Sequence, residues 1–163
     1  MPRGALLLLS VILPLLIFLG GCPAPVPDSS GWTNDSFSYS RLIAYCEDKA
    51  LDEDYYLYWD NISIDKIGRV YGYINLTHWD GDYGLEILLM TMDGFAAYDS
   101  GESFSAWHRS VYTEGYYSFE FTNVTPGNYA LVVDNTNRGW EATDFDFVND
   151  YAVFDFEAYF EPY

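Results

Sequence analysis

The feature that most constrains the fold is an alternation of apolar and other residues near the C-terminus. In residues 152–160 (AVFDFEAYF) every second residue is Ala or Phe, and acids, Val or Tyr fill the places between them. Successive side chains of a β-strand point to opposite faces, so this period of two predicts a strand that buries one face. Residues 117–122 repeat the alternation, and Tyr129, Leu131 and Val133 form another inward-facing set.

Three earlier segments are also predicted to be strands. Residues 55–59 are aromatic and are bounded by Asp54 and Asp60, and residues 69–77 alternate between two faces. Residues 85–92 are almost continuously apolar, which indicates a central strand covered on both faces.

Other segments are less distinct. The stretch Phe37–Cys46 fits a strand and Arg41–Leu51 fits a short helix; we favour the strand, followed by an acidic loop. Residues 95–101 are expected to form a further strand, and residues 104–112 a connection or a short strand. No window after residue 55 shows a sustained helical period.

Turn-forming residues separate these segments. They gather at 78–84 (HWDGDYG), at Asp93-Gly94, which is predicted to be a tight turn, and at 123–128. Seven to nine short strands with turns between them predict an all-β chain that forms an antiparallel, jelly-roll-like β-sandwich after an N-terminal signal helix and a Pro-rich spacer.

The segment 119–135 (FEFTNVTPGNYALVVDN) resembles the closing hairpin of small extracytoplasmic β-sandwich modules of the pre-peptidase C-terminal and GOLD-like kinds. The matching residues are Gly127, Tyr129, Leu131, Val133, Asp134 and Asn135. This resemblance implies a module that assists or tethers, and it carries no catalytic residue across. From the residues themselves, we expect Gly127 to let the chain turn and the Tyr129 hydroxyl to reach the backbone, as in a tyrosine corner.

The first 22 residues, MPRGALLLLSVILPLLIFLGGC, have the composition of a secretory signal: a cation, an apolar run and small residues. The apolar run would cover about 24 Å as a helix, less than a bilayer core of about 30 Å, which disfavours a permanent span. Its end, Leu19-Gly20-Gly21-Cys22, resembles the lipobox of prokaryotic lipoproteins, in which the cysteine receives a diacylglyceryl group and becomes the first residue of the mature chain.

This resemblance implies that residues 1–21 are a signal peptide and that Cys22 is lipidated, so that acyl chains hold the protein at the membrane. An uncleaved anchor and plain secretion are the alternatives. Residues 22–31 then contain the lipidated cysteine and a Pro/Ser spacer. Residues 32–163 form the β-sandwich domain.

Acidic residues dominate the mature chain. The segment 1–21 contains one of the seven basic residues and no acid, which leaves six basic against 25 acidic residues, a formal charge of −19. Nucleic acid is therefore excluded as an expected partner, because phosphate contacts need the opposite sign. A saline habitat explains such a surface, and an acidic exterior without that meaning explains it equally well.

Two cysteines, Cys22 and Cys46, are too few for a disulfide framework. If Cys22 carries lipid, Cys46 is expected to serve as a small buried hydrophobe. A Cys22–Cys46 disulfide is the competing possibility, and it would exclude lipidation.

The residue pattern does not indicate an enzyme. His78 and His108 each lie beside a tryptophan, and neither has a recognisable spacing for a nucleophile or a metal ligand. Carboxylate pairs could serve glycoside hydrolysis, but among 25 acids a pair carries no information. We therefore expect no catalytic residues and no required cofactor.

Calcium is the one metal that the sequence suggests. Asp80-Gly-Asp82 offers two carboxylates in a glycine-containing loop, a ligand type that Ca²⁺ accepts. Further oxygens could come from Asp134, Asn135, Asp144 and Asp146. The pattern is not that of an EF-hand, and Asp and Gly are also good turn formers.

Four tryptophans lie in predicted loops or in the spacer: Trp32, Trp79, Trp107 and Trp140. Loop tryptophans beside carboxylates can bind sugars by stacking and hydrogen bonding. They can also cap the ends of a sandwich or form a protein interface, and from the sequence we favour this second explanation.

Four Asn-x-Ser/Thr sequons begin at Asn34, Asn61, Asn75 and Asn123. Asn75 is expected on an outward strand face, and Asn61 and Asn123 at turns, so most could carry glycan; Pro126 makes the Asn123 site the least favourable. Asn-rich turns are the alternative explanation. Glycosylation would favour a prokaryote with surface N-glycosylation, such as an archaeon.

These features predict a lipid-anchored, extracytoplasmic domain of the cell surface that binds or scaffolds without chemistry. Its expected partners are the membrane, through the anchor, and an envelope protein or polysaccharide. The alternative is an accessory module that recruits substrate for a secreted hydrolase or transporter.

Overall fold

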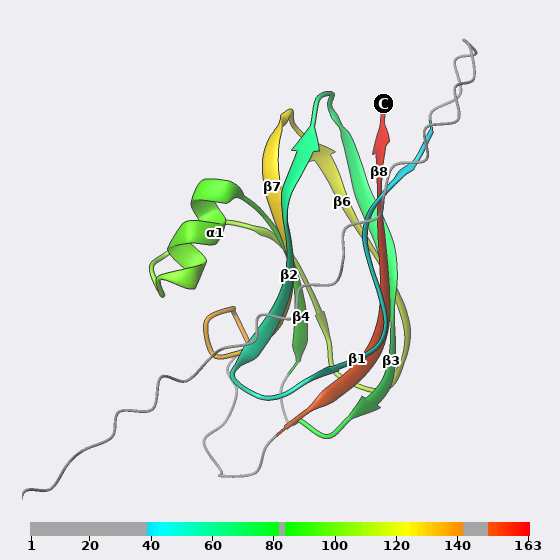
Figure 1. The fold of residues 1–163 in the computed structure, drawn as a ribbon, viewed down its shortest axis with the longest axis vertical. Coiled ribbons are helices and arrows are strands. Elements are labelled where there is room, and N and C mark those ends of the chain that lie inside the picture. Colours follow the sequence, from blue (N-terminus) through cyan, green and yellow to red (C-terminus); the bar gives the residue numbers. More distant parts are fainter. Residues whose placement is uncertain (1–38, 82–83, 142–149) are drawn as a thin grey trace, which may run out of the picture.

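In the part of the chain that the structure describes, eight strands form two four-stranded sheets that pack face to face (Figure 1). The computed structural model describes residues 39–81, 84–141 and 150–163. The predicted signal peptide, Cys22, the spacer, Asn34 and Trp32 lie outside these residues. Within the described part of the chain, no helix has the length and apolar character needed to cross a membrane.

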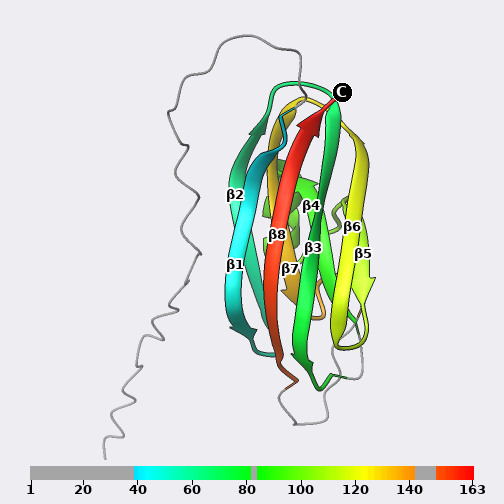
Figure 2. The same cartoon turned by 90° about the vertical axis from the view of Figure 1, so that its right-hand side faces the viewer.

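The strand order is that of a jelly roll. The elements are β1 (Arg41–Leu51), β2 (Tyr55–Ile64), β3 (Gly68–Trp79), β4 (Leu85–Thr91), α1 (Met92–Asp99), β5 (Trp107–Val111), β6 (Gly115–Val124), β7 (Gly127–Asn135) and β8 (Ala152–Pro162). Sheet A has the order β1-β8-β3-β6 and sheet B the order β2-β7-β4-β5; Figure 2 shows sheet A in front of sheet B. All six strand pairings are antiparallel. The predicted jelly-roll-like sandwich is confirmed.

The core between the sheets is built from the alternating residues that the sequence identified. On β8, Phe154, Phe156 and Phe160 are each 3% exposed or less. Phe156 stacks on Trp59 of β2 and on Phe119 of β6, with ring centroids 5.0 and 5.5 Å apart. This places aromatic contacts across the middle of the sandwich, where burial of large rings contributes most to stability.

The β6–β7 hairpin contains the predicted tyrosine corner. Tyr129 is buried, and its hydroxyl donates to the carbonyl oxygen of Thr125 at 2.9 Å. The left-handed residue of this turn is Asn123, with φ 57°, and not Gly127. A Cβ at Gly127 would lie 3.2 Å from the Tyr129 ring, so Gly127 makes room for that ring.

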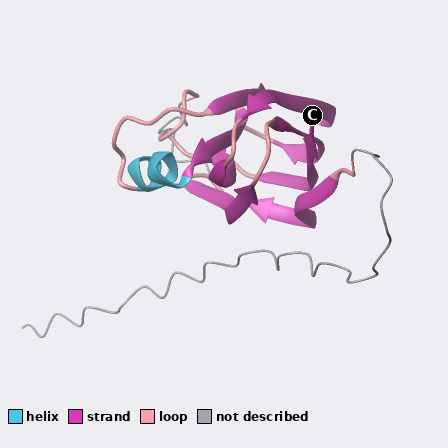
Figure 3. Ribbon diagram, turned by 90° about the horizontal axis from the view of Figure 1, so that it is seen from above, coloured by secondary structure: helices cyan, strands magenta, loops and turns pink. Residues whose placement is uncertain are grey.

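Strand β4 lies inside sheet B and is covered on both faces, as predicted. Ile87 and Leu89 face the core between the sheets, whereas Leu88 and Met90 face a second cluster that includes Tyr98 of α1. Figure 3 shows that α1 lies to one side of the two strand layers. The helix therefore supplies the cover for the outer face of sheet B.

Helix α1 corrects the interpretation of residues 93–101. Asp93-Gly94 is not a tight turn but belongs to the first helical turn, and residues 95–99 are helical, not a strand. Thr91 caps the helix, because its Oγ1 accepts a hydrogen bond from Gly94 N at 3.1 Å. The helix has only eight residues, too few to give a sustained period, and its stability depends on packing against sheet B.

Residues 41–51 also differ in detail from the expectation. They form one strand, as favoured, but the predicted acidic loop is a bulge within β1. The bulge lies between Cys46 and Lys49, where Asp48 has φ 46°. Strand β3 likewise continues to Trp79, into the predicted turn.

Candidate functional site

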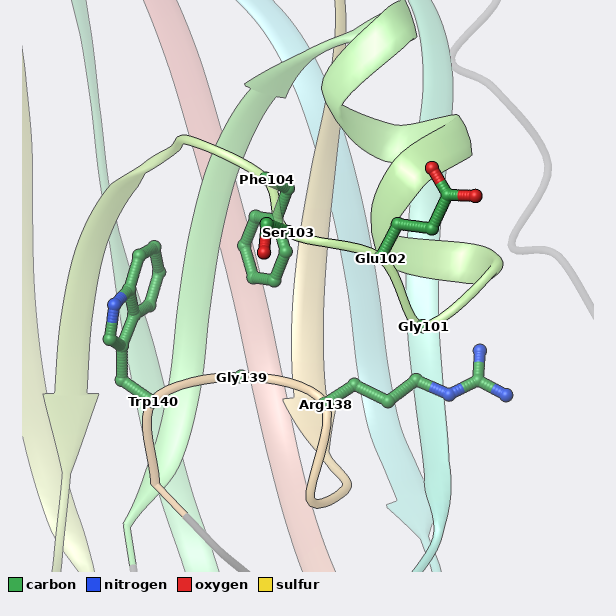
Figure 4. Close-up of a pocket in the computed structure, with 7 residues that line it drawn as sticks. All are labelled: Gly101, Glu102, Ser103, Phe104, Arg138, Gly139 and Trp140. Carbon is green, nitrogen blue, oxygen red and sulfur yellow. The ribbon is translucent and has the colours of Figure 1, made fainter.

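A pocket of about 320 Å³ lies between the segment that follows α1 and the loop that follows β7. The first segment contributes Gly101, Glu102, Ser103 and Phe104, and the second contributes Arg138, Gly139 and Trp140 (Figure 4). The rings of Phe104 and Trp140 lie at one end of the pocket, and the side chains of Glu102 and Arg138 lie at the other. The pocket thus combines an aromatic end with a charged end.

Trp140 is exposed at the aromatic end. It is 53% exposed, whereas Trp79 and Trp107 pack against the core. Its ring meets Phe104 edge-on, at a centroid distance of 5.1 Å, and His108 at 4.8 Å. These neighbours hold the indole in place while much of its surface stays accessible to a ligand.

The charged end is tied to the helix. The Arg138 guanidinium donates to the Asp99 carbonyl oxygen at 2.9 Å and lies 3.3 Å from Asp99 Oδ1. The Tyr56 hydroxyl donates to the same carboxylate oxygen at 2.5 Å, and the guanidinium lies over the Tyr56 ring. Since Asp99 ends α1, these contacts connect the loop after β7 to the helix.

A row of polar residues crosses all four strands of sheet B beneath the loop. Cross-strand register places Tyr56, Asp134, Glu86 and Ser110 side by side. Glu86 and Asp134 are each 1% exposed. A Cβ on Gly139 would overlap Glu86 Oε2 and come within 2.8 Å of Asp134 Oδ2. The backbone of Gly139 therefore lies directly over the two carboxylates, and only glycine fits there.

The two carboxylates bind both ends of the segment 136–141, which forms one side of the pocket. Asp134 Oδ1 accepts a hydrogen bond from Thr136 N at 3.0 Å, and Glu86 Oε2 accepts one from Glu141 N at 3.1 Å. The side chain of Glu141 is held in turn by the Tyr112 hydroxyl, which donates to its Oε1 at 2.6 Å. Residues 136–141 are thus fixed by buried charge-assisted hydrogen bonds.

Burial changes the protonation of both acids. It raises the pKa of Glu86 to about 7; the amides of Glu141 and Trp140 act in the opposite direction, and the charge of Asp134 adds to the rise. Burial also raises the pKa of Asp134 to about 6, against the hydrogen bonds from Thr136. The two acids that bind the segment 136–141 therefore both have pKa values near neutral pH.

His108 lies in the same network, in an arrangement that superficially resembles a catalytic triad. Its Nε2 is 2.7 Å from Glu86 Oε1 and 2.9 Å from Ser110 Oγ. In a Ser-His-acid triad the serine and the acid contact different ring nitrogens. The acid can then stabilise the positive charge of the imidazole ring after the ring takes the proton of the serine. Here both contacts share Nε2, and Ser110 Oγ also donates to Glu141 at 3.0 Å. Burial lowers the pKa of His108. The cluster fits a structural network better than a nucleophile.

Sequence reasoning named some of these residues and missed others. Sequence reasoning offered Trp140 as a sugar-binding residue or, as the favoured explanation, as an end cap or interface residue, and it offered Asp134 as an oxygen ligand. Glu86 was missed, although it is the one acid within the apolar run 85–92. A carboxylate in a strand covered on both faces must be buried, and this was the signal that could have found it.

The predicted calcium ligands are placed as follows. Asp80 Oδ1 accepts a hydrogen bond from Tyr151 N at 2.7 Å, and Asp80 Oδ2 is 3.5 Å from His78 Nε2. Asp82, Asp144 and Asp146 lie outside the described residues. Within the described ranges, no three His, Cys, Asp or Glu residues are grouped to hold a metal. A calcium site at Asp80 and Asp82 stays a prediction.

The three described sequons differ in accessibility. Asn61 and Asn123 were expected at turns, but Asn61 lies in an irregularity within β2 and Asn123 near the end of β6. Both are exposed, with left-handed φ of 54° and 57°. Asn75 is half-buried on the outer face of sheet A, where its Nδ2 donates to Asp155 Oδ2 at 3.2 Å. A glycan at Asn75 would replace one of the two Nδ2 hydrogens and would have to fit beside Asp155. Asn61 and Asn123 are therefore the more accessible acceptors, and the low rank of Asn123, which rests on Pro126, stays a prediction.

Comparison of the sequence with protein-family models and with curated proteins gives no match. The resemblance of residues 119–135 to extracytoplasmic modules, and that of residues 19–22 to a lipobox, stay predictions.

Proposed function

We propose that this chain is a lipid-anchored binding domain of the cell surface that acts without catalysis and binds a glycan in the pocket at Trp140. The observation that carries the proposal is the exposed indole of Trp140, held beside Phe104 on a loop whose two ends are fixed to buried carboxylates. A fixed, exposed aromatic ring presents a flat apolar face on which a ligand can stack.

The chemistry of the pocket suits a sugar ring. The apolar face of a pyranose can stack on Trp140, while Glu102 can accept hydrogen bonds from hydroxyl groups and Arg138 can donate them. The volume, about 320 Å³, lies at the low end of the range of about 300–1,000 Å³ for small-molecule pockets. We therefore expect the pocket to hold a short glycan segment or a chain end, and not a long stretch of polymer.

Two further observations support binding over catalysis and surface attachment over solution. The shared Nε2 contact of His108 does not fit a serine nucleophile. Lipidation at Cys22, as its resemblance to a lipobox implies, would hold the pocket near the cell envelope. An accessory role beside a secreted hydrolase or transporter would use the same pocket with a different neighbour.

The test is a glycan array with the mature chain, followed by calorimetric titration with each glycan that binds. Trp140→Ala should weaken binding by about tenfold or more, which corresponds to about 1.4 kcal/mol. Tyr163→Ala is the matched control, because Tyr163 is 69% exposed and lies outside the pocket. Equal affinities for the wild type and Trp140→Ala, or an array without binding, would overturn the proposal. Cross-linking on intact cells then distinguishes an envelope partner from a hydrolase or permease.

A further inference from the structure

The outer face of sheet A contains a second pocket, of about 250 Å³, with different chemistry. Its side chains include three tyrosines, Tyr45, Tyr73 and Tyr116, and three acids, Glu47, Asp155 and Glu157. Its lining residues include no Lys or Arg. We propose that this pocket binds a quaternary ammonium group.

Strand pairing assembles the pocket from distant parts of the chain. Tyr45 of β1 and Tyr73 of β3 lie on either side of Glu157 of β8, each as its direct cross-strand neighbour. One row further along, Asn75 of β3 lies between Asp155 of β8 and Tyr116 of β6. All four strands of sheet A thus contribute to one site.

The rings and the charges are both fixed. Tyr73 and Tyr116 stack with centroids 4.8 Å apart and an interplanar angle of 26°, and Tyr116 is 65% exposed. Glu157 Oε2 accepts a hydrogen bond from the Tyr159 hydroxyl at 2.5 Å. A hydrogen bond to Glu47 raises the pKa of Tyr45 to about 12, and one to Glu157 raises the pKa of Tyr73. The rings therefore stay neutral and electron-rich beside negative carboxylates.

This combination selects an organic cation. Ring faces attract cations through their quadrupole, and the carboxylates add net negative charge. A metal ion needs oxygens that converge on one point, and within the described residues no three acids are grouped in this way. A primary ammonium is strongly hydrated, whereas a methylated ammonium loses little hydration when it contacts rings. The negative charge and the tyrosine rings of the pocket therefore both favour a methylated ammonium group over a primary ammonium group or a metal ion.

The experiment titrates the mature chain with choline and follows backbone amide shifts on β1, β3, β6 and β8. Two probes serve as matched controls: 3,3-dimethylbutan-1-ol, which has the shape of choline without its charge, and ethanolamine, which has the charge without the methyl groups. Choline should bind, and the affinity of each control probe should be lower by at least about tenfold.

Variants test the residues. Tyr116→Ala should weaken choline binding by about threefold to thirtyfold, Tyr116→Phe should retain it, and Glu157→Gln should weaken it. Tyr55→Ala is the control, because Tyr55 is 56% exposed on sheet B. Circular dichroism confirms that each variant is folded.

Absence of choline binding overturns the proposal. Equal binding of the neutral isostere removes the role of charge, and equal binding of ethanolamine removes the role of the rings; either result also overturns it. Because this pocket and the Trp140 pocket lie on different sheets and use different probes, each proposal can fail while the other holds.

Discussion

The two sheets of this sandwich differ in what covers their outer faces. The outer side of sheet B lies under α1 and the loop 136–141, so that Leu88, Met90 and Glu86 are all buried. The outer side of sheet A has no such cover among the described residues, and the outward residues of β8, such as Asp155 and Glu157, are partly exposed. Figures 1 and 2 show the helix on one side of the molecule and the open sheet on the other.

This difference changes what the same kind of side chain does. Under the cover, burial raises the pKa of Glu86 to about 7, and the carboxylate fixes a loop. On the open face, Glu157 accepts a hydrogen bond from Tyr159 and borders a pocket that solvent can enter. The cover over sheet B is therefore what buries Glu86 and raises its pKa.

The largest expected effect comes from removing the covered charge. The pKa of Glu86 is raised in the folded state, so between about pH 4.5 and 7 the folded chain holds a proton that the unfolded chain releases. The free energy of unfolding therefore falls as pH rises through this window, by roughly 3 kcal/mol for this group. Glu86→Gln should lose this slope and be more stable than the wild type at pH 8. Urea unfolding of the wild type and of Glu86→Gln at pH 5 and pH 8 measures the slope and the difference in stability. An equal change of stability with pH in the two proteins would contradict the raised pKa of Glu86.

The next effect concerns the loop above the carboxylates. Gly139→Ala places a methyl group on Glu86 Oε2, which must push the loop away. We expect a loss of about 1–3 kcal/mol of stability and faster hydrogen exchange of the Glu141 amide. Gly101→Ala is the control: Gly101 has φ 72° but no atom near a new Cβ, so it tests backbone strain without a clash. Unchanged Glu141 exchange in Gly139→Ala would show that the loop is not held as described.

The third prediction concerns the N-terminus of helix α1, which covers the outer face of sheet B. Thr91→Ala removes the cap of α1 and should cost about 1 kcal/mol, whereas Thr91→Ser keeps the hydroxyl and should cost less. Thermal unfolding of both variants measures the difference. Equal losses in the two would mean that the Thr91 methyl, and not the hydrogen bond, matters.

The smallest effect is expected on the open face. Glu157→Gln keeps an acceptor for the Tyr159 hydroxyl and changes a partly exposed group, so stability should change by less than about 0.5 kcal/mol. Urea unfolding of this variant and of the wild type at pH 7 measures the change. A loss of more than about 1 kcal/mol would remove the contrast between the two faces.

Much of the fold could be predicted from the sequence, because each strand repeats a local rule. The alternation in residues 152–160 gave the buried face of β8, and the apolar run 85–92 gave a strand covered on both sides. The Tyr129 hydrogen bond to Thr125 was also predicted from the local pattern. These features depend on neighbours close in sequence.

The candidate site could be predicted only in part. Trp140 was noticed because it lies in a predicted loop, but its contact with Phe104 joins positions on two separate loops. Helix α1 was missed because eight residues carry little periodicity, and its packing on Leu88 and Met90 is what makes it helical. Glu86 was missed although the apolar run 85–92 predicts burial on both faces; its placement beside Asp134 and under Gly139 is a tertiary feature.

The sequence by itself determined the strand periodicity, the acidic character and the resemblance of residues 19–22 to a lipobox, because each is a property of composition or local order. The tertiary structure alone decided which face is covered. It brought Glu86 next to Asp134 and Tyr45 next to Glu157, through cross-strand pairs between positions far apart in the chain. Burial, and with it the pKa of an acid, depends on everything packed around the group, which no local pattern encodes.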